Sequence, residues 1–381
     1  MKINTKVLHG YEITDKTTGS SSVPIYQAST FHQNDLDKHS GPIYSRFSNP
    51  SRSGLCGAIC AIEEAKYAEI FASGMAAISA ALLQFKQGDH IIACQNIYGG
   101  TFQLMTEMLP AYGIEVTFVD ATDPQNYLAA IKENTRAFYL ETPSNPTLQI
   151  TDLKGVIAIA KKHNLLTICD NTFMTPLLSN VIALGVDISI NSATKFINGH
   201  SDVVLGTLAT NNATLAEKIH KIAVVLGGIA APFDCWLTMR GLKSMAMRIK
   251  QASHNAQKIA EFLASHPQVK QVFYPGLASH SGHKIHMQQS KHGGMIISFD
   301  LGSYQKVTRF LHEIKIPLVA VSLGGIESII SYPAKMSHAC VSPEDRLKQG
   351  VTDGLLRYSV GCEDAEDLIE DLKQALAKLE D

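Results

Sequence analysis

The chain has 381 residues, of which 45% are hydrophobic and 18% are charged, and its formal net charge is −2. This length and composition fit two domains with large cores, and they exclude disordered, collagen-like and coiled-coil proteins. A charge so close to zero gives no general attraction for nucleic acid or for a membrane surface, so neither is expected as a partner. The seven cysteines are dispersed and odd in number, which is typical of a reduced, cytoplasmic protein.

The first 45 residues are polar and rich in turn-forming residues, and they show no sustained hydrophobic period. Such an arm is either mobile or held against another surface. From residue 64 onward, short apolar runs typical of strands alternate with helical patterns, of which residues 75–85 and 153–163 are the clearest. The strand-like runs are residues 69–72, 90–94, 115–119, 136–140, 165–169, 187–191 and 203–209. Strands and helices in series predict a mostly parallel, seven-stranded sheet.

After residue 233 the regular alternation of strands and helices ends. Helical periodicity is predicted for three segments, residues 245–263, 304–313 and 364–379, and strand character for two, residues 269–274 and 295–300. The sequence therefore predicts an α/β fold in three parts. These are an N-terminal arm at residues 1–46, a large domain at residues 47–245 and a smaller α+β domain at residues 246–381.

Polar side chains follow several of the predicted strands. In an open parallel sheet, ligands bind beyond the carboxyl ends of the strands, so these residues are candidates for a site. Ser73-Gly74 opens a helix whose free N–H groups suit a phosphate, and the hydroxyls of Ser192 and Thr194 suit the same group. Asp170 ends one strand-like run, and Lys195 follows another.

A lysine and an aspartate at one edge of a sheet fit the needs of pyridoxal phosphate. The amine of Lys195 would form a Schiff base with the cofactor's aldehyde, and the carboxylate of Asp170 would keep the pyridine nitrogen protonated. Tyr98, in the loop after residues 90–94, would offer an aromatic face to the ring. Each signal alone also has a structural explanation as surface lysine, helix cap or turn, so the prediction depends on their coincidence.

The segment around Lys195, SATKFINGHSDVV at residues 192–204, resembles the pyridoxal-phosphate signature of the Cys/Met-metabolism enzymes. This family includes cystathionine γ-synthase, cystathionine γ-lyase, cystathionine β-lyase and methionine γ-lyase. Further similar motifs are YSR at 44–46, ASGMA at 72–76, YGGT at 98–101, ETPSNP at 141–146, DNTF at 170–173, SLGG at 322–325 and LRYSVG at 356–361. The resemblance spans nearly the whole chain and implies an enzyme of pyridoxal-phosphate fold type I.

The resemblance also implies roles for the matching residues. Lys195 would be the Schiff-base lysine and proton carrier, Asp170 the partner of the pyridinium nitrogen and Tyr98 the stacking, proton-exchanging tyrosine. The implied phosphate-binding residues are Gly74, Met75, Ser192 and Thr194, with Tyr44 and Arg46 reaching the phosphate of a neighbouring subunit. The implied substrate-binding residues are Arg357, which grips the α-carboxylate, and Ser322, Asn145 and Val321. Sites shared in this way imply a homodimer, and family members are typically tetramers of two such dimers; no metal is expected.

We expect a pyridoxal-phosphate-dependent carbon–sulfur lyase of methionine and cysteine metabolism. Its reaction would be γ-elimination from cystathionine, homocysteine or methionine, giving 2-oxobutanoate, ammonia and a thiol. Val321 and Gln103 stand where many cystathionine enzymes carry an acid and an arginine, which favours less charged substrates. Methionine γ-lyases, however, carry a cysteine where Gly100 stands. Cystathionine γ-synthase and β-lyase activities remain alternatives, and an inactive relative that serves as a binding partner is the alternative of a different class.

Overall fold

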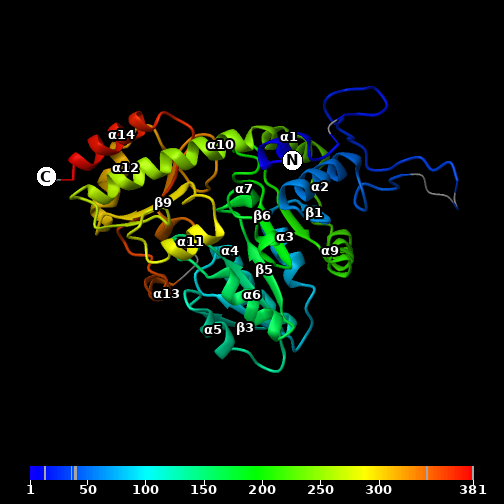
Figure 1. Cartoon of the computed structure of the whole chain (residues 1–381), viewed down its shortest axis with the longest axis horizontal. Helices are drawn as coiled ribbons and strands as arrows, with labels where there is room; N and C mark the ends of the chain where they lie inside the picture. Colours follow the sequence, from blue (N-terminus) through cyan, green and yellow to red (C-terminus); the bar gives the residue numbers. More distant parts are fainter. Residues whose placement is uncertain (13, 36, 38–40, 340–341, 380–381) are drawn as a thin grey trace.

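A computed structural model describes residues 1–12, 14–35, 37, 41–339 and 342–379, which form two β-sheets with helices on their faces (Figure 1). The first sheet has seven strands in the order β1-β7-β6-β5-β4-β2-β3. These strands are β1 (Tyr67–Phe71), β2 (His90–Cys94), β3 (Glu115–Val119), β4 (Thr135–Glu141), β5 (Leu166–Asp170), β6 (Ile188–Ser192) and β7 (Gly206–Thr210). Only β7 pairs antiparallel, with β1 and with β6. The predicted α/β fold with a mostly parallel, seven-stranded sheet is confirmed.

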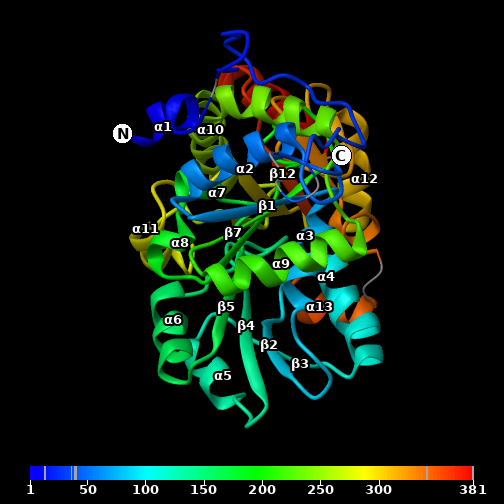
Figure 2. The ribbon, with the colours of Figure 1, turned by 90° about the vertical axis from the view of Figure 1, so that its right-hand side faces the viewer.

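Helices cover both faces of this sheet because its strands present apolar side chains on both sides. Ile91 and Tyr139 pack on one face, whereas their neighbours Ile92 and Phe138 pack on the other. The first face is covered by α3 (Gly74–Leu82), α4 (Gly99–Gln103) and α9 (Ala213–Leu226). A short π-helix at Leu104–Met108 and a 3-10 helix at Leu109–Tyr112 lie on the same face. The second face is covered by α2 (Pro50–Glu63), α5 (Pro124–Ala129), α6 (Leu153–Lys162), α7 (Thr175–Leu178) and α8 (Val181–Leu184). Figure 2 shows α9 and α6 on either side of the strands.

The second sheet has five strands in the order β10-β11-β12-β9-β8. They are β8 (Gln271–Phe273), β9 (Ile296–Asp300), β10 (Leu318–Val319), β11 (Ile329–Ser331) and β12 (Leu355–Ser359). In β12, Leu356 and Tyr358 pack in a core cluster under α12 (Tyr304–Glu313) and α14 (Ala365–Ala377). Since successive side chains on a strand point to opposite faces, Arg357 points away from those helices.

The helix α10 (Pro232–Ser265) links the two sheets. It packs against α1 (Ile3–His9) and α2 on one side of the molecule, and against α14, β8 and β9 on the other. The expected domain boundary between residues 245 and 246 falls inside this continuous helix, so the division into domains stays a prediction. Smaller elements complete the second region: α11 (His283–Gln289), the 3-10 turn Pro333–Lys335 and α13 (Pro343–Lys348).

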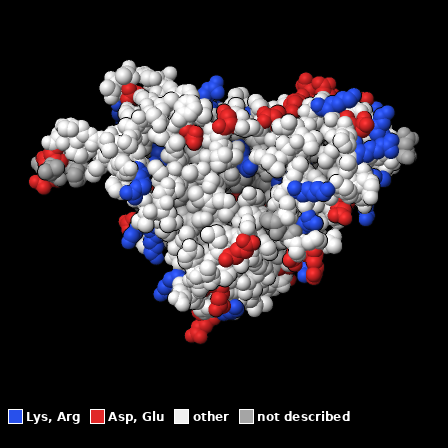
Figure 3. Space-filling model, turned by 180° about the vertical axis from the view of Figure 1, so that it is seen from behind, with Lys and Arg blue, Asp and Glu red and all other residues white. Residues whose placement is uncertain are grey.

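Several elements have no counterpart in the sequence-based prediction. The apolar stretch at residues 222–233 contains the end of one helix and the start of the next: α9 ends at Leu226 and is followed by Gly227, whose φ is 74°, and α10 begins at Pro232. The strands β10 and β11 are only two and three residues long, which is too short for a readable period. Within the described ranges, no helix combines the length and the apolar character that crossing a membrane requires. Basic and acidic side chains are mixed over the visible surface, as the near-zero net charge predicts (Figure 3).

Candidate active site

Lys195 lies just beyond the carboxyl end of β6, where the loops of the first sheet meet the second sheet. Its Nζ donates a hydrogen bond of 2.6 Å to the hydroxyl of Ser322, which lies between β10 and β11. Burial, together with the nearby cation of Arg357, lowers the pKa of the Lys195 amine to about 8. The lowered pKa makes the uncharged amine more abundant near neutral pH than it is in an exposed lysine, and the uncharged form is the one that acts as a base or a nucleophile.

Arg357 supplies a buried cation next to Lys195, and its side chain is 3% exposed. One Nη donates to Oδ1 of Asn145 at 3.0 Å, and the other donates to the carbonyl of Ser322 at 2.8 Å. Its Nε is buried and has no partner in the described residues. Burial lowers the pKa of the guanidinium to about 10, against the effect of Tyr98 and Glu141. A buried cation bonded to neutral oxygens suits an anionic group of a ligand.

The segment that carries Ser322 is held tightly against Lys195. Ser322 itself has a φ of 84°, a left-handed conformation that is unusual for a serine. Two residues later, Gly324 also has a positive φ of 79°, and a Cβ there would lie 3.0 Å from Cα of Lys195. Glycine is thus needed for the close approach, and the strained Ser322 is placed where its hydroxyl meets Lys195 and its carbonyl meets Arg357.

Asp170 is the last residue of β5 and is almost fully buried. Its Oδ1 accepts hydrogen bonds from the backbone N–H and the hydroxyl of Thr172, at 3.0 and 2.6 Å. Burial raises the pKa of Asp170, while the bonds from Thr172 oppose that shift. Among the described residues no cation pairs with this carboxylate. A buried carboxylate that has no cationic partner of its own fits a cationic ligand atom such as a pyridinium nitrogen.

The N-terminus of α3 forms a cradle beside β6. Ser73 caps the helix through its hydroxyl, and a Cβ at Gly74 would lie only 3.0 Å from Cβ of Ser192. The hydroxyl of Thr194 accepts a hydrogen bond from the N–H of Leu205 at 2.9 Å. Helix N–H groups and hydroxyls in a space that only glycine leaves open fit a phosphate group.

Tyr98 and Met75 lie side by side at the edge of this cradle. A Cβ at Gly100 would meet Cε1 of Tyr98 at 2.7 Å and the sulfur of Met75 at 3.0 Å, so a glycine is required between them. The Tyr98 side chain is 40% exposed. Its backbone N–H donates to Oε2 of Glu141 at 2.9 Å, which fixes the loop to the end of β4.

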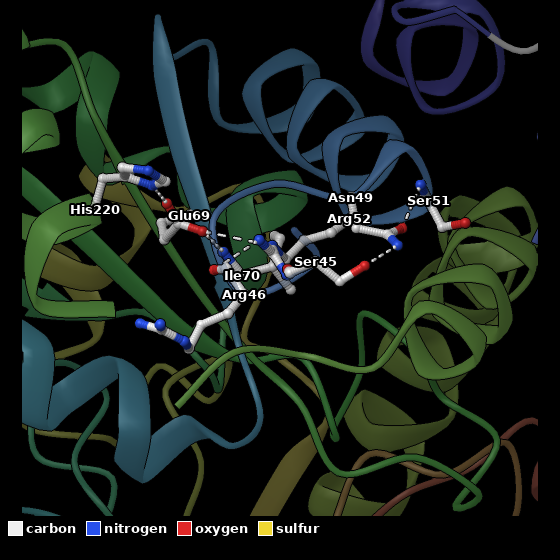
Figure 4. A network of polar contacts seen from close by, with 8 residues as sticks. All are labelled: Ser45, Arg46, Asn49, Ser51, Arg52, Glu69, Ile70 and His220. Atoms are coloured by element: carbon white, nitrogen blue, oxygen red, sulfur yellow. Dashed lines mark hydrogen bonds and ion pairs between the residues drawn. The ribbon is translucent and has the colours of Figure 1, made fainter. Parts of the chain in front are cut away.

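Tyr44 and Arg46 lie on the segment before α2: Tyr44 forms a β-bridge with Thr30, and Arg46, drawn in Figure 4, contacts α9. Nη1 of Arg46 donates to the carbonyl of Val224 at 2.6 Å, and the guanidinium lies 5.0 Å from the ring centre of Phe47. Arg52 of α2 donates to the carbonyl of Arg46 at 3.3 Å. The structure does not bring this pair into contact with Lys195 of the same chain.

The structure thus places most of the predicted residues together, and it adds two that sequence reasoning missed. The hydroxyl of Thr172 accepts a hydrogen bond from the N–H of Ser192 at 2.8 Å and so links the ends of β5 and β6. Glu141 accepts hydrogen bonds from two loops of the site. The sequence signal for Glu141 is its position directly after the strand-like run 136–140, where ligand-binding residues are expected. Val321 is 63% exposed beside Ser322.

Comparison with known proteins agrees with this geometry. The family model for Cys/Met metabolism PLP-dependent enzymes matches residues 4–377. A cystathionine beta-lyase of Bacillus subtilis is 48% identical over 99% of this chain and 97% of its own. A cystathionine gamma-lyase of the same organism is 46% identical over the full length of both chains. The crystal structure of a cystathionine gamma-lyase from Lactobacillus plantarum, complexed with L-serine, superposes with a TM-score of 0.97, with 40% identity and full coverage of both chains.

Proposed function

From the premise that the chain belongs to the Cys/Met-metabolism enzymes that depend on pyridoxal 5'-phosphate, we propose that it is a carbon–sulfur lyase acting by γ-elimination on a sulfur amino acid. The observation that carries the proposal is the buried amine of Lys195 next to the buried cation of Arg357, with Ser322 bonded to both. A base and a carboxylate-binding group at this spacing suit removal of the α-proton of an amino acid.

The residues present fit the cofactor. The glycine-lined cradle at Gly74 and Ser192 would hold its phosphate, together with Met75 and Thr194. Asp170 would face its ring nitrogen, and the ring of Tyr98 would lie against its face. When bound, pyridoxal phosphate supplies an aldehyde that bonds the amine of Lys195 or of the substrate, and a cationic ring that withdraws electrons from the substrate.

In the proposed mechanism, Arg357 binds the α-carboxylate of the substrate through its N–H groups and so fixes the direction of the Cα–H bond. Asn145 and the Ser322 carbonyl hold the guanidinium in place. The amine of Lys195 would remove the α-proton and deliver it to the bound cofactor; neutral again, it would remove a second proton from Cβ for γ-elimination. Tyr98 would donate a proton to the departing sulfur. Addition of one water gives 2-oxobutanoate, ammonia and the thiol.

The choice of γ-elimination depends on the surroundings of Ser322. The exposed, apolar Val321 beside Ser322 supports substrates with an uncharged distal end, such as homocysteine or methionine. Cystathionine, whose distal end is charged, stays among the candidate substrates. The two Bacillus subtilis relatives, a beta-lyase and a gamma-lyase, have nearly equal identity and do not separate β-elimination from γ-elimination.

Product analysis with cystathionine tests the proposal. We expect 2-oxobutanoate and cysteine in equal amounts. Pyruvate with homocysteine would instead assign β-elimination, and activity only on an O-acylhomoserine with cysteine would assign a γ-synthase. A protein that stays colourless with added cofactor and turns over none of these compounds would support an inactive binding partner.

We also propose that the active enzyme is a cytoplasmic homo-oligomer of site-sharing dimers, which pair as tetramers. The segment before α2 exposes apolar side chains that a second copy would cover, namely Ile25, Tyr26, Ile43, Tyr44 and Phe47. In this arrangement Tyr44 and Arg46 would reach the phosphate bound by the partner. Mixing an Arg46→Ala protein with a Lys195→Ala protein, each nearly inactive, should restore activity in mixed dimers; no recovery after subunit exchange would contradict sharing.

A further inference from the structure

Glu141 is a buried carboxylate at the end of β4 that the proposed mechanism does not use. It is 6% exposed, and each of its oxygens accepts one backbone hydrogen bond. Oε2 accepts the N–H of Tyr98 at 2.9 Å, and Oε1 accepts the N–H of Asn145 at 3.0 Å. One side chain therefore joins the loop that follows β2 to the loop that follows β4.

Both of these loops carry side chains that would contact the ligands. Tyr98 lies at the edge of the phosphate cradle, and Asn145 bonds Nη1 of Arg357 at 3.0 Å. A displacement of the Asn145 loop would therefore release one of the two bonds that fix the guanidinium. Glu141 thus acts on Arg357 through Asn145, and on the ring position through Tyr98.

Opposing electrostatic effects act on the carboxyl group of Glu141. Glu141 and Asp170 are register partners on neighbouring strands, and burial together with Asp170 raises the pKa of Glu141. The two backbone N–H bonds and the cation of Arg357 oppose that shift. Glu141 is within electrostatic range of Arg357 but does not bond it, so the N–H groups of Arg357 that Asn145 and Ser322 do not use, including Nε–H, are left for a substrate carboxylate.

We propose that Glu141 is a positioning residue for substrate binding, which holds Tyr98 and the Asn145–Arg357 pair at a fixed separation through its two backbone hydrogen bonds. The inference rests on the proposed function, because it assumes that Arg357 binds the α-carboxylate. Glu141 is not a catalytic residue in this account, since it touches neither the amine of Lys195 nor the substrate.

The test compares two variants of Glu141 with a matched control. Asp371 is an equally buried carboxylate at 6% exposure, and it likewise accepts backbone N–H groups, from Lys315 at 3.0 Å and Ile316 at 2.8 Å, in the second sheet region. Glu141→Gln keeps one acceptor oxygen, Glu141→Ala keeps none, and Asp371→Asn makes the isosteric change outside the site. All are measured as cofactor-loaded enzymes, and the visible absorbance of the bound cofactor checks that Lys195 and Asp170 still hold it.

We expect KM for cystathionine and the inhibition constant of L-alanine to rise about tenfold in Glu141→Gln and about 100-fold in Glu141→Ala, with a smaller fall in kcat, because buried backbone N–H groups lose their acceptors. Asp371→Asn should lower the melting temperature and leave both constants unchanged. Equal constants in wild type and Glu141→Gln, or an equal rise in Asp371→Asn, would overturn the proposal. If Glu141→Ala fails to fold, Glu141→Gln decides.

The L-alanine measurement also separates this inference from the proposed function. If the wild-type enzyme cleaves no sulfur amino acid, the lyase assignment fails. Binding of L-alanine, followed through the absorbance of the cofactor, still reports the carboxylate-binding group. Weaker binding in Glu141→Gln would then support the positioning role, and unchanged binding would contradict it.

Discussion

Buried charged side chains have different partners in two regions of the molecule. One is the site around Lys195, and the other is the polar network of Arg52, Glu69 and His220. In the network, Nε of the buried Arg52 lies 3.9 Å from Glu69, and Glu69 accepts a hydrogen bond from Nδ1 of His220 at 2.7 Å (Figure 4). In the site, Lys195 and Arg357 are bonded to neutral oxygens, and no described residue forms an ion pair with either. Because buried charges without partners cost free energy, those at the site are explained by the ligands that they are built to meet.

The largest effect is expected from Lys195→Ala, which removes the base and the cofactor's anchor. We expect kcat to fall by at least about 10³-fold, in line with the loss of a general base, and the visible absorbance to be lost or shifted. Lys291→Ala serves as the control, since its Nζ donates to the carbonyl of Leu177 and makes no other hydrogen bond among the residues that the structure describes. That variant should stay within about twofold of the wild-type rate, as expected for a substitution outside the site.

The next effect concerns the shape of the cation at the substrate site. Arg357→Lys keeps the charge but loses the planar fork that bonds Asn145 and Ser322 and faces the substrate. We expect kcat/KM for cystathionine to fall about 10²-fold, mainly through KM, because lysine cannot make a two-pronged bond to a carboxylate. Steady-state kinetics checks this, and an unchanged KM would remove Arg357 from the substrate site.

Arg52→Ala should show the opposite pattern. The substitution leaves Glu69 without its buried cation and removes hydrogen bonds to the carbonyls of Ser45 and Arg46. We expect the free energy of unfolding to fall by about 2 kcal/mol, with a small change in kcat when cofactor is in excess. A collapse of kcat without a loss of stability in denaturant titrations would place Arg52 among the functional charges.

The smallest effect is expected at His220, which is half exposed. The hydrogen bond to Glu69 raises the pKa of His220 above its ordinary value. The ion pair therefore contributes stability that is full below pH 6.5 and is lost as the pH rises through the raised pKa. After solvent screening we expect His220→Gln to lose under about 1 kcal/mol at pH 5.5 and nothing at pH 8. A larger loss of stability at pH 8 than at pH 5.5 would contradict this pH dependence.

The first sheet could be predicted from sequence because its strands are local apolar runs between polar ends. Residues 90–94 and 115–119 coincide with β2 and β3, and residues 304–313 coincide with α12. The central strand of the second sheet, β12, was not predicted, because Arg357 interrupts its apolar run. Its register partners on β9 and β11 are distant in sequence and leave no local pattern.

The candidate site likewise contains residues that the sequence predicts and contacts that it does not. Lys195, Asp170 and the Ser73-Gly74 turn could be proposed from their places after predicted strands. The contacts of Ser322 with Lys195 and Arg357 join residues 127 and 35 positions apart, so sequence offered them only through resemblance to a family. The position of Glu141 after a strand-like run marks it as a candidate, but its contacts could not be predicted, since they join two loops that meet only in the folded chain.

The central claim is that Lys195 is the residue that bonds the cofactor. Reduction of the cofactor-loaded enzyme with sodium borohydride, followed by peptide mass spectrometry, tests it directly. We predict a pyridoxyl adduct on the side chain of Lys195 in the peptide that contains residues 192–204. An adduct on any other lysine, with Lys195 unmodified, would contradict the account.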